Sequence, residues 1–383
     1  MKRKALLISI LLGMAAGQLV AEGERSWTLT NTLRIGYDDN VHRDAVNEDG
    51  SFFVTDIVDL GWRASLSDRT DFTLKTQLVA LSDKDQRLYP NLYAVLNHSV
   101  TPRVLMSLSD YFRYADRTGQ VTGAKPNKRY DYYYNRVMLN SSYVFNPKTR
   151  VQLSLANAIE RNDNAIKVYD TTRNSVGISV ARELKPQQTH LTIAADFADF
   201  EYENLKSDYQ QATASAELGH TFNPEWNGVA GVGVDYLDKS YVGQSDDTSA
   251  HPRANLGLTY SPSPRTRISG SYSRQFSGAT SDTRYIGSLD QTVKAGVQHD
   301  LTAKTMIEGT ARDVDRDYDA DDQQAAGVTT DNDEERLHLA LRVHYKLNRT
   351  HYLEAGVSYT DVDRKTGGDW DQSKVDVGWR IEI

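Results

Sequence analysis

Apolar and polar residues alternate most clearly near the end of the chain. Apolar side chains occupy every second position from Leu337 to Leu347, with polar or small residues between them. The alternation returns from Leu353 to Tyr359 and from Val375 to Ile383. A period of two places the two sets on opposite faces of a β-strand. The pattern therefore predicts strands that each have one apolar and one polar face.

Tight polar connections recur along the chain at intervals of roughly 35–45 residues, about two strands and one longer connection. They are rich in Pro, Asn and Ser, which favour turns through restricted φ angles or side-chain bonds to the nearby backbone. The eight connections are Ser67–Thr70, Thr101–Arg103, Asn146–Thr149, Lys185–Gln188, Asn223–Glu225, Ser261–Pro264, Thr302–Lys304 and Asn348–Thr350.

Longer polar stretches separate these turns, for example Asp38–Ser51, Asp116–Lys128, Leu237–His251 and Arg312–Glu334. We predict an all-β fold, a transmembrane antiparallel up-and-down outer-membrane β-barrel of about 18 strands, with short periplasmic turns and long extracellular loops. A β-propeller or a soluble solenoid of similar repeat length is the alternative. Neither alternative explains an apolar strand face that has no visible packing partner.

Aromatic residues are predicted to form two belts, because amphipathic rings gather where lipid headgroups meet hydrocarbon. One set lies beside the tight turns or the termini: Trp27, Trp62, Tyr143, Phe145, Phe222, Trp226, Tyr260, Tyr345 and Trp379. The other lies beside the longer connections: Tyr37, Phe52, Phe112, Tyr114, Tyr133, Phe197, Tyr236, Tyr272 and Tyr359.

The N-terminus has a basic start, an apolar run from Ala5 to Ala16 and a small residue at Ala21. These features predict a signal peptide over residues 1–21, cleaved near Ala21, followed by one barrel domain over residues 22–383. A membrane anchor is the alternative, although the apolar run is short for a bilayer. The chain has no cysteine, so neither a lipid attachment site nor a disulfide framework is expected.

Charge excludes a general nucleic-acid binder. Removing residues 1–21 removes Lys2, Arg3 and Lys4 and no acid, so the formal net charge of −8 becomes −11. We expect a location in the outer membrane of a Gram-negative bacterium. The expected partners are outer-membrane lipid, lipopolysaccharide and the barrel assembly machinery, with no nucleic acid.

The last residues resemble the terminal insertion signal of outer-membrane barrels: a polar residue, then Gly, then two spaced apolar residues at the chain end. The matching positions are Asp376, Gly378, Ile381 and Ile383. Ile383 departs from the signal, because an aromatic residue is commoner at its last position.

With the apolar set facing lipid, the alternate residues face a lumen wide enough for water or a plug. We predict a basic wall on the first six and last three strands, opposite an acidic wall on strands seven to eleven. Such walls would select solutes by charge; the alternative is that lumen charges pair with one another. The basic candidates are Arg34, Arg63, Lys75, Arg113, Arg136, Arg336, Arg342, Lys346 and Arg380, and the acidic candidates are Glu160, Glu183, Asp196, Glu217 and Asp235.

Other motifs are less specific. Arg312–Asp322 is rich in Asp, but Asp322 stands where a calcium loop needs Gly and Val328 where it needs Glu. A solvated loop or a looser divalent-ion site are the readings left open. The histidines form no zinc motif, and no particular Ser, His and Asp residues are brought together by spacing. We expect no metal, no cofactor and no enzymatic activity.

A tyrosine-rich stretch beside the longer connection Asp116–Lys128 is a candidate sugar-binding rim, because aromatic rings stack on sugar faces and cations meet acidic groups. Its residues are Lys128, Arg129, Tyr130, Tyr132 and Tyr134. The alternative is a segment of the aromatic belt below a soluble loop.

At Gly36–Val41, reading Gly-Tyr-Asp-Asp-Asn-Val, the chain resembles a family of β-barrel porins often found with exopolysaccharide and capsule export systems. The strand end Ser109–Phe112 is also similar to that family. The resemblance implies a conduit for exopolysaccharide export, with periplasmic export components as partners. Two alternatives remain: a general or sugar- or anion-selective diffusion porin, and a plugged structural or surface-binding barrel.

Overall fold

The computed structural model describes residues 26–41, 49–82, 86–119, 128–162, 170–202, 207–241, 247–278, 287–318, 333–365 and 368–383. Within these ranges the chain forms eighteen β-strands in one sheet. The first nine are β1 (Trp27–Asp38), β2 (Ser51–Ser67), β3 (Thr70–Ser82), β4 (Gln86–Thr101), β5 (Val104–Gly119), β6 (Lys128–Asn146), β7 (Thr149–Asn162), β8 (Thr171–Lys185) and β9 (Thr189–Tyr202). The others are β10 (Ser207–Thr221), β11 (Trp226–Tyr241), β12 (Asp247–Ser263), β13 (Thr266–Gly278), β14 (Gly287–Asp300), β15 (Thr305–Tyr318), β16 (Glu334–Lys346), β17 (His351–Arg364) and β18 (Trp370–Glu382).

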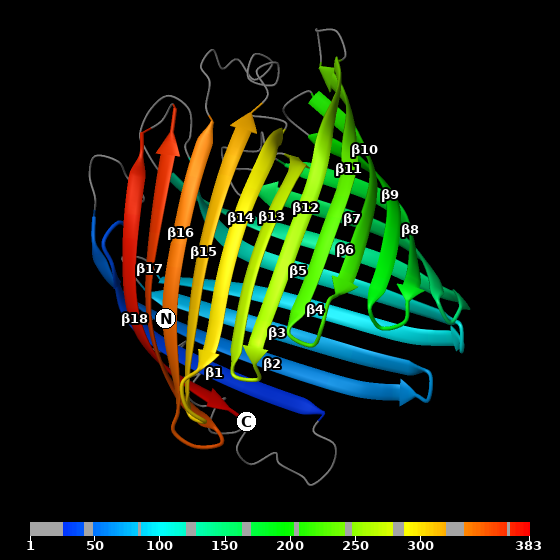
Figure 1. Ribbon diagram of the computed structural model, residues 1–383. Coiled ribbons are helices and arrows are strands. Elements are labelled where there is room, and N and C mark those ends of the chain that lie inside the picture. Colours follow the sequence, from blue (N-terminus) through cyan, green and yellow to red (C-terminus); the bar gives the residue numbers. More distant parts are fainter. Residues whose placement is uncertain are drawn as a thin grey trace.

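Each strand pairs antiparallel with its neighbours in sequence, and β1 pairs with both β2 and β18, so the sheet closes into a barrel (Figure 1). At the closure, the amides of Leu29 and Ile383 each donate a hydrogen bond to the carbonyl of the other, at 3.0 and 2.8 Å. All eight predicted tight turns connect consecutive strands at one end of the barrel. The predicted fold class and strand number are confirmed.

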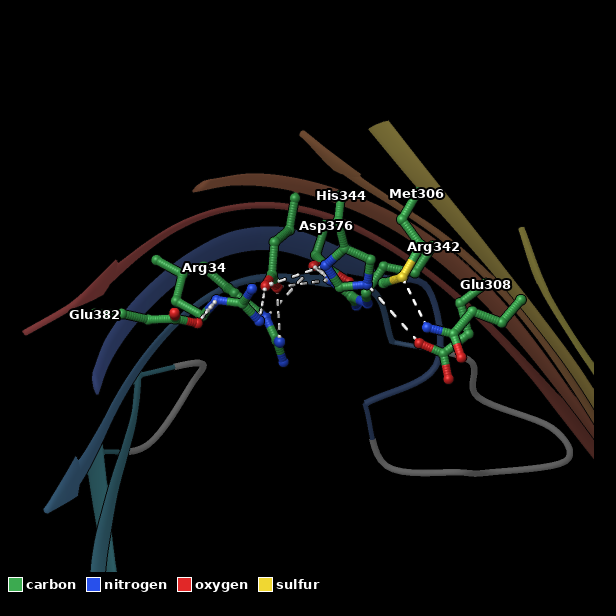
Figure 2. A network of polar contacts seen from close by, with 10 residues as sticks. Arg34, Met306, Glu308, Arg342, His344, Asp376 and Glu382 are labelled. Carbon is green, nitrogen blue, oxygen red and sulfur yellow. Dashed lines mark hydrogen bonds and ion pairs between the residues drawn. The ribbon is translucent and has the colours of Figure 1, made fainter. Parts of the chain in front are cut away.

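The two faces of the wall differ as the alternation predicts. Partners across a ladder share a face, and following the registers round the barrel puts one set of alternate residues inside. Figure 2 shows members of this set, including Arg34 and Asp376, on the concave side of the wall. We call it the lumen face. The outer face is apolar and exposed, as at Leu341 and Val377. Such a face is stable against the hydrocarbon of a lipid bilayer.

Aromatic contacts support both predicted belts on the outer face. At the tight-turn end, Trp27 stacks on Trp62 with ring centroids 5.5 Å apart, and Trp226 similarly meets Tyr260 at 4.1 Å. At the other end, Tyr37 and Phe52 meet edge to face at 5.2 Å. These rings mark the upper and lower limits of the apolar band.

The strands extend further into the polar stretches than the sequence predicts. β11 continues to Tyr241, β12 begins at Asp247 and β15 continues to Tyr318. Polarity does not end a strand above the apolar band, because the backbone ladder is satisfied whichever solvent the side chains meet. Arg312 therefore lies in a strand and not in a loop. Residues 319–332, with the rest of the Asp-rich stretch, and the predicted signal peptide lie outside the described residues.

The ladder between β12 and β13 is incomplete. Its last rung towards the long-loop end joins Ala254 to Arg274, although both strands continue beyond this point. Pro252 lies just beyond the rung, and proline is tolerated at such an unpaired edge because it has no N–H to donate. The wall therefore divides here, and the upper ends of the two strands diverge (Figure 1).

Beyond the division, Phe276 of β13 turns into the barrel. Alternation would place its side chain outside, yet it is 4% exposed and contacts Tyr209 and His251 on the lumen face. Its backbone N–H donates a 3.1 Å hydrogen bond to the carboxylate of Asp235 on β11. This side-chain acceptor replaces the missing rung, because a buried amide needs a partner.

Gly287 of β14 makes room for the Phe276 ring, because a Cβ there would collide with the ring and lie 2.7 Å from the Ser277 carbonyl oxygen. We expect Gly287→Ala to lower the free energy of unfolding by about 1–3 kcal/mol, the usual cost of overpacking. Denaturant unfolding of the refolded barrel in lipid vesicles measures the change.

Gly270→Ala is the matched control, since the nearest atom to its added Cβ is 4.0 Å away. Its free energy of unfolding should change by no more than about 0.5 kcal/mol. Equal effects of the two substitutions would show that the Phe276 packing does not contribute to stability.

Candidate functional site in the lumen

A network of charged side chains lies on the lumen face of the closing strands, and Figure 2 labels Arg34, Arg342 and Asp376 among its members. The contacts of the network centre on Glu354 of β17. The Glu354 side chain is 1% exposed. Its carboxylate lies 3.0 Å from Nη2 of Arg34, 3.0 Å from Nη1 of Arg380 and 3.6 Å from Nη1 of Arg342. One carboxylate thus joins cations from β1, β16 and β18.

Asp376 of β18 is the second acid of the network. Arg342 donates to both of its carboxylate oxygens, at 2.9 and 2.7 Å, in the bidentate geometry that suits a guanidinium. Gly378 lies opposite Arg34 in the β1–β18 ladder, and a Cβ there would be 2.9 Å from Cγ of Arg34. The glycine of the terminal signal thus leaves space for a lumen arginine, while Ile381 and Ile383 belong to the outer face.

Further contacts complete the network at its edges. Arg380 also lies 3.2 Å from Glu382, and His344 bridges between Glu308 at 3.8 Å and Glu354 at 3.4 Å. The three arginines are therefore matched by the three carboxylates of Glu354, Asp376 and Glu382. This part of the predicted basic wall is electrically compensated, and it ties the two ends of the sheet together.

The remaining predicted basic residues are not all compensated by carboxylates. By register, all nine lie on the lumen face. Arg336 pairs with Glu334 at 2.8 Å, and Lys346 lies over the Tyr352 ring at 5.6 Å. A further group on β2, β3, β5 and β6 forms no ion pair with any carboxylate in the described part of the chain: Arg63, Lys75, Arg113 and Arg136. Uncompensated positive charge therefore lies on this side of the lumen.

The five predicted acidic residues also lie on the lumen face by register. Asp235 is fully buried, accepts a 2.7 Å hydrogen bond from Thr213 Oγ1 and lies 3.5 Å from Arg253. The Asp235 carboxylate therefore interacts with neighbouring side chains of the barrel wall. Glu217 accepts a 2.8 Å hydrogen bond from Asn255. Glu183 accepts a hydrogen bond from the Gln187 amide at the tight turn. Asp196 lies in the middle of β9, and Glu160 lies towards the long-loop end of β7.

The tyrosine-rich stretch divides between the two faces. Tyr132 and Tyr134 point to the lumen, whereas Tyr133 is exposed on the outside. Tyr132 is 4% exposed and lies under Arg113, whose Cζ is 5.9 Å from the ring centroid. The side chains of Lys128, Arg129 and Tyr130 lie outside the described residues, so a sugar-binding rim stays a prediction.

Sequence reasoning missed several cations on the lumen face of β14 and β15. Lys294 and Arg312 lie directly opposite each other in the ladder between these strands. Arg312 opens a polar stretch and is therefore predicted to lie in a loop, but continuing the alternation of β15 past Ile307 and Gly309 places it on the lumen face. Across the described ranges, no group of three His, Asp or Glu side chains is arranged to hold a metal ion.

A closed eighteen-stranded barrel with an apolar exterior, two aromatic belts and a charged lumen defines an outer-membrane β-barrel of the porin kind. More closely, the chain belongs to the family described as "Putative beta-barrel porin 2", whose model matches residues 187–383. The predicted family and the outer-membrane location are thus confirmed. No curated protein matches the chain. No helix in the described segments is long and apolar enough to span a membrane.

Solved structures with a similar fold include outer-membrane proteins of known kinds. OccK2 (OpdF) of Pseudomonas aeruginosa, in complex with glucuronate, is 9% identical with a TM-score of 0.53; the match covers 94% of this chain and 98% of that one. OccK1 (OpdK) of the same species is 10% identical with a TM-score of 0.53, and the match covers 93% of this chain and 99% of that one. The FrpB iron transporter of Neisseria meningitidis is 8% identical with a TM-score of 0.51, and the match covers 94% of this chain and 83% of that one. At these identities the likeness concerns the fold alone.

Proposed function

We propose that the barrel is a conduit for a polar solute that carries negative charge or is a carbohydrate. The observation that carries the proposal is the uncompensated positive charge of Arg63, Lys75, Arg113 and Arg136 on the lumen face. Fixed cations in a water-filled passage attract anions and repel cations, so they bias what passes. The ion-paired network around Glu354 adds little to this bias, because its charges compensate.

The favoured version of this function is export of an acidic or neutral exopolysaccharide, assisted by periplasmic export components. The resemblance at Gly36–Val41 supports it. The second candidate is a diffusion porin for small anions or sugars. The similar fold of OccK2, solved with glucuronate, favours that version. In both versions the protein catalyses no reaction and is inserted by the barrel assembly machinery into a membrane of lipid and lipopolysaccharide.

Conductance of the refolded protein in a planar bilayer tests the shared proposal. We expect steady current steps and, under a salt gradient, a reversal potential of the sign that indicates preference for anions. A protein that conducts only after deletion of residues 319–332 or 120–127 would instead be a plugged barrel. Loss of surface polysaccharide on gene deletion in the native host, with polymer retained in the periplasm, separates export from diffusion.

A further inference from the structure

Two cations face each other on the lumen side of neighbouring strands. Lys294 of β14 and Arg312 of β15 are direct partners in the antiparallel ladder, so their Cβ atoms lie close together. Like charges in this position repel, and neither residue has an ion-pair partner among the described carboxylates. An arrangement of this kind is stabilised when an anion lies between or beside the two groups.

Arg312 also borders a cavity of about 330 Å³ on the lumen face of β15 to β18. His338 is its partner on β16, and the Nδ1 atom of His338 lies 2.9 Å from the Thr360 hydroxyl. Cations from β15, β16 and β18 thus line the cavity together with neutral hydrogen-bonding groups from β16, β17 and β18. Its lining includes Arg312, Arg336, His338, Thr360, Gln372 and Lys374.

The cavity has more cations than carboxylates around it. The Glu334 carboxylate forms ion pairs with three arginines: Arg316 at 3.2 Å, Arg336 at 2.8 Å and Arg364 at 2.7 Å. Lys374 pairs with Asp38 at 3.0 Å. Asp290 also lies 3.8 Å from Arg316, so two carboxylates face three guanidinium groups, and Lys294 and Arg312 add two further positive charges. The balance of described charges therefore favours an anionic ligand.

We propose that this cavity binds one acidic sugar unit through its carboxylate. Arg312 supplies a planar guanidinium that matches a carboxylate in a bidentate manner. Lys294 is not part of the cavity lining, but as the ladder partner of Arg312 it adds positive charge beside the cavity. Thr360 and His338 offer hydrogen bonds to sugar hydroxyl groups, whereas the Gln372 side-chain nitrogen already donates to Asp38 and to the Asn40 carbonyl. The volume lies at the lower end of the range for small-molecule pockets, which fits a single sugar unit.

The inference deepens the proposed function, because a bound solute must reach the lumen. Binding is therefore measured separately from conduction. Isothermal titration calorimetry of the refolded full-length barrel in detergent would use sodium glucuronate, with glucose and inorganic phosphate as comparison ligands. Saturable binding of glucuronate is expected, tighter than binding of phosphate and much tighter than that of glucose.

Arg312→Ala and Lys294→Ala test the assignment. Arg312→Ala removes the lining guanidinium that would hold the carboxylate, so it should weaken glucuronate binding by about tenfold or more. Lys294→Ala removes a neighbouring charge outside the lining and should weaken binding by a smaller factor. The matched control is Arg349→Ala, which removes the same charge from the exposed turn between β16 and β17 and should leave the affinity unchanged. Glucuronate should also reduce the ion current of the wild-type barrel more than that of Arg312→Ala.

Equal affinity of the wild type and both lumen variants would overturn the site, because glucuronate would then bind elsewhere. Phosphate bound as tightly as glucuronate would overturn the sugar-acid class and leave a general oxyanion site. A barrel that binds glucuronate in an Arg312-dependent way but never conducts would support this site. The proposed conduit alone would then be wrong.

Discussion

Glu354→Ala should destabilise the barrel by about 3 kcal/mol, the low end of the cost of removing one partner of a buried ion pair. The substitution leaves Arg34, Arg342 and Arg380 facing one another without their shared carboxylate. The cost stays at the low end because each arginine side chain is still 25–29% exposed and can be hydrated from the lumen. Denaturant unfolding in lipid vesicles measures the free energy.

Glu308→Ala is the control for this prediction. Glu308 is half exposed and lies 3.8 Å from His344 at the edge of the same network, so its loss should cost no more than about 1 kcal/mol. If both substitutions had the same small effect, the network would contribute little to stability. The closure of β1 on β18 would then depend on its backbone ladder and outer-face packing.

Reversing three lumen cations together, with Arg63→Glu, Arg113→Glu and Arg136→Glu, should turn preference for anions into preference for cations. The reversal changes the fixed charge of the passage by six units, and these residues have no described carboxylate partner that would offset it. The reversal potential under a salt gradient should change sign. Arg34 and Arg342 are less suitable, because their reversal would also break the ion pairs with Glu354 and Asp376.

A matched triple variant separates lumen charge from total charge. Arg69→Glu, Arg103→Glu and Arg265→Glu change the net charge equally, but these arginines lie on exposed tight turns. Their variant should keep preference for anions, with a smaller shift that added salt screens. A similar shift of the reversal potential in both variants, or in neither, would show that the lumen cations do not lie in the conduction path.

The faces and the number of strands follow from the sequence because they depend on local rules. A period of two decides which residues share a face, and short Pro-, Asn- and Ser-rich segments decide where the chain reverses. The stretch Leu337–Leu347 shows this well, since its apolar residues face outwards and Arg342 faces the lumen. The orientation of all predicted wall residues could be derived in this way.

Only the tertiary structure decided which lumen charges compensate each other. Arg34 and Glu354 are 320 positions apart and meet because the last strand closes on the first. That Arg63 and Arg312 form no ion pair with a described carboxylate was likewise beyond sequence reasoning, since charge pairing depends on neighbouring strands and side-chain reach. Phe276 breaks the alternation for a non-local reason: β13 leaves β12 near Pro252 and finds its acceptor on Asp235. Local periodicity determines which face of the barrel wall a residue occupies, and the closure of the barrel determines which residues become its partners.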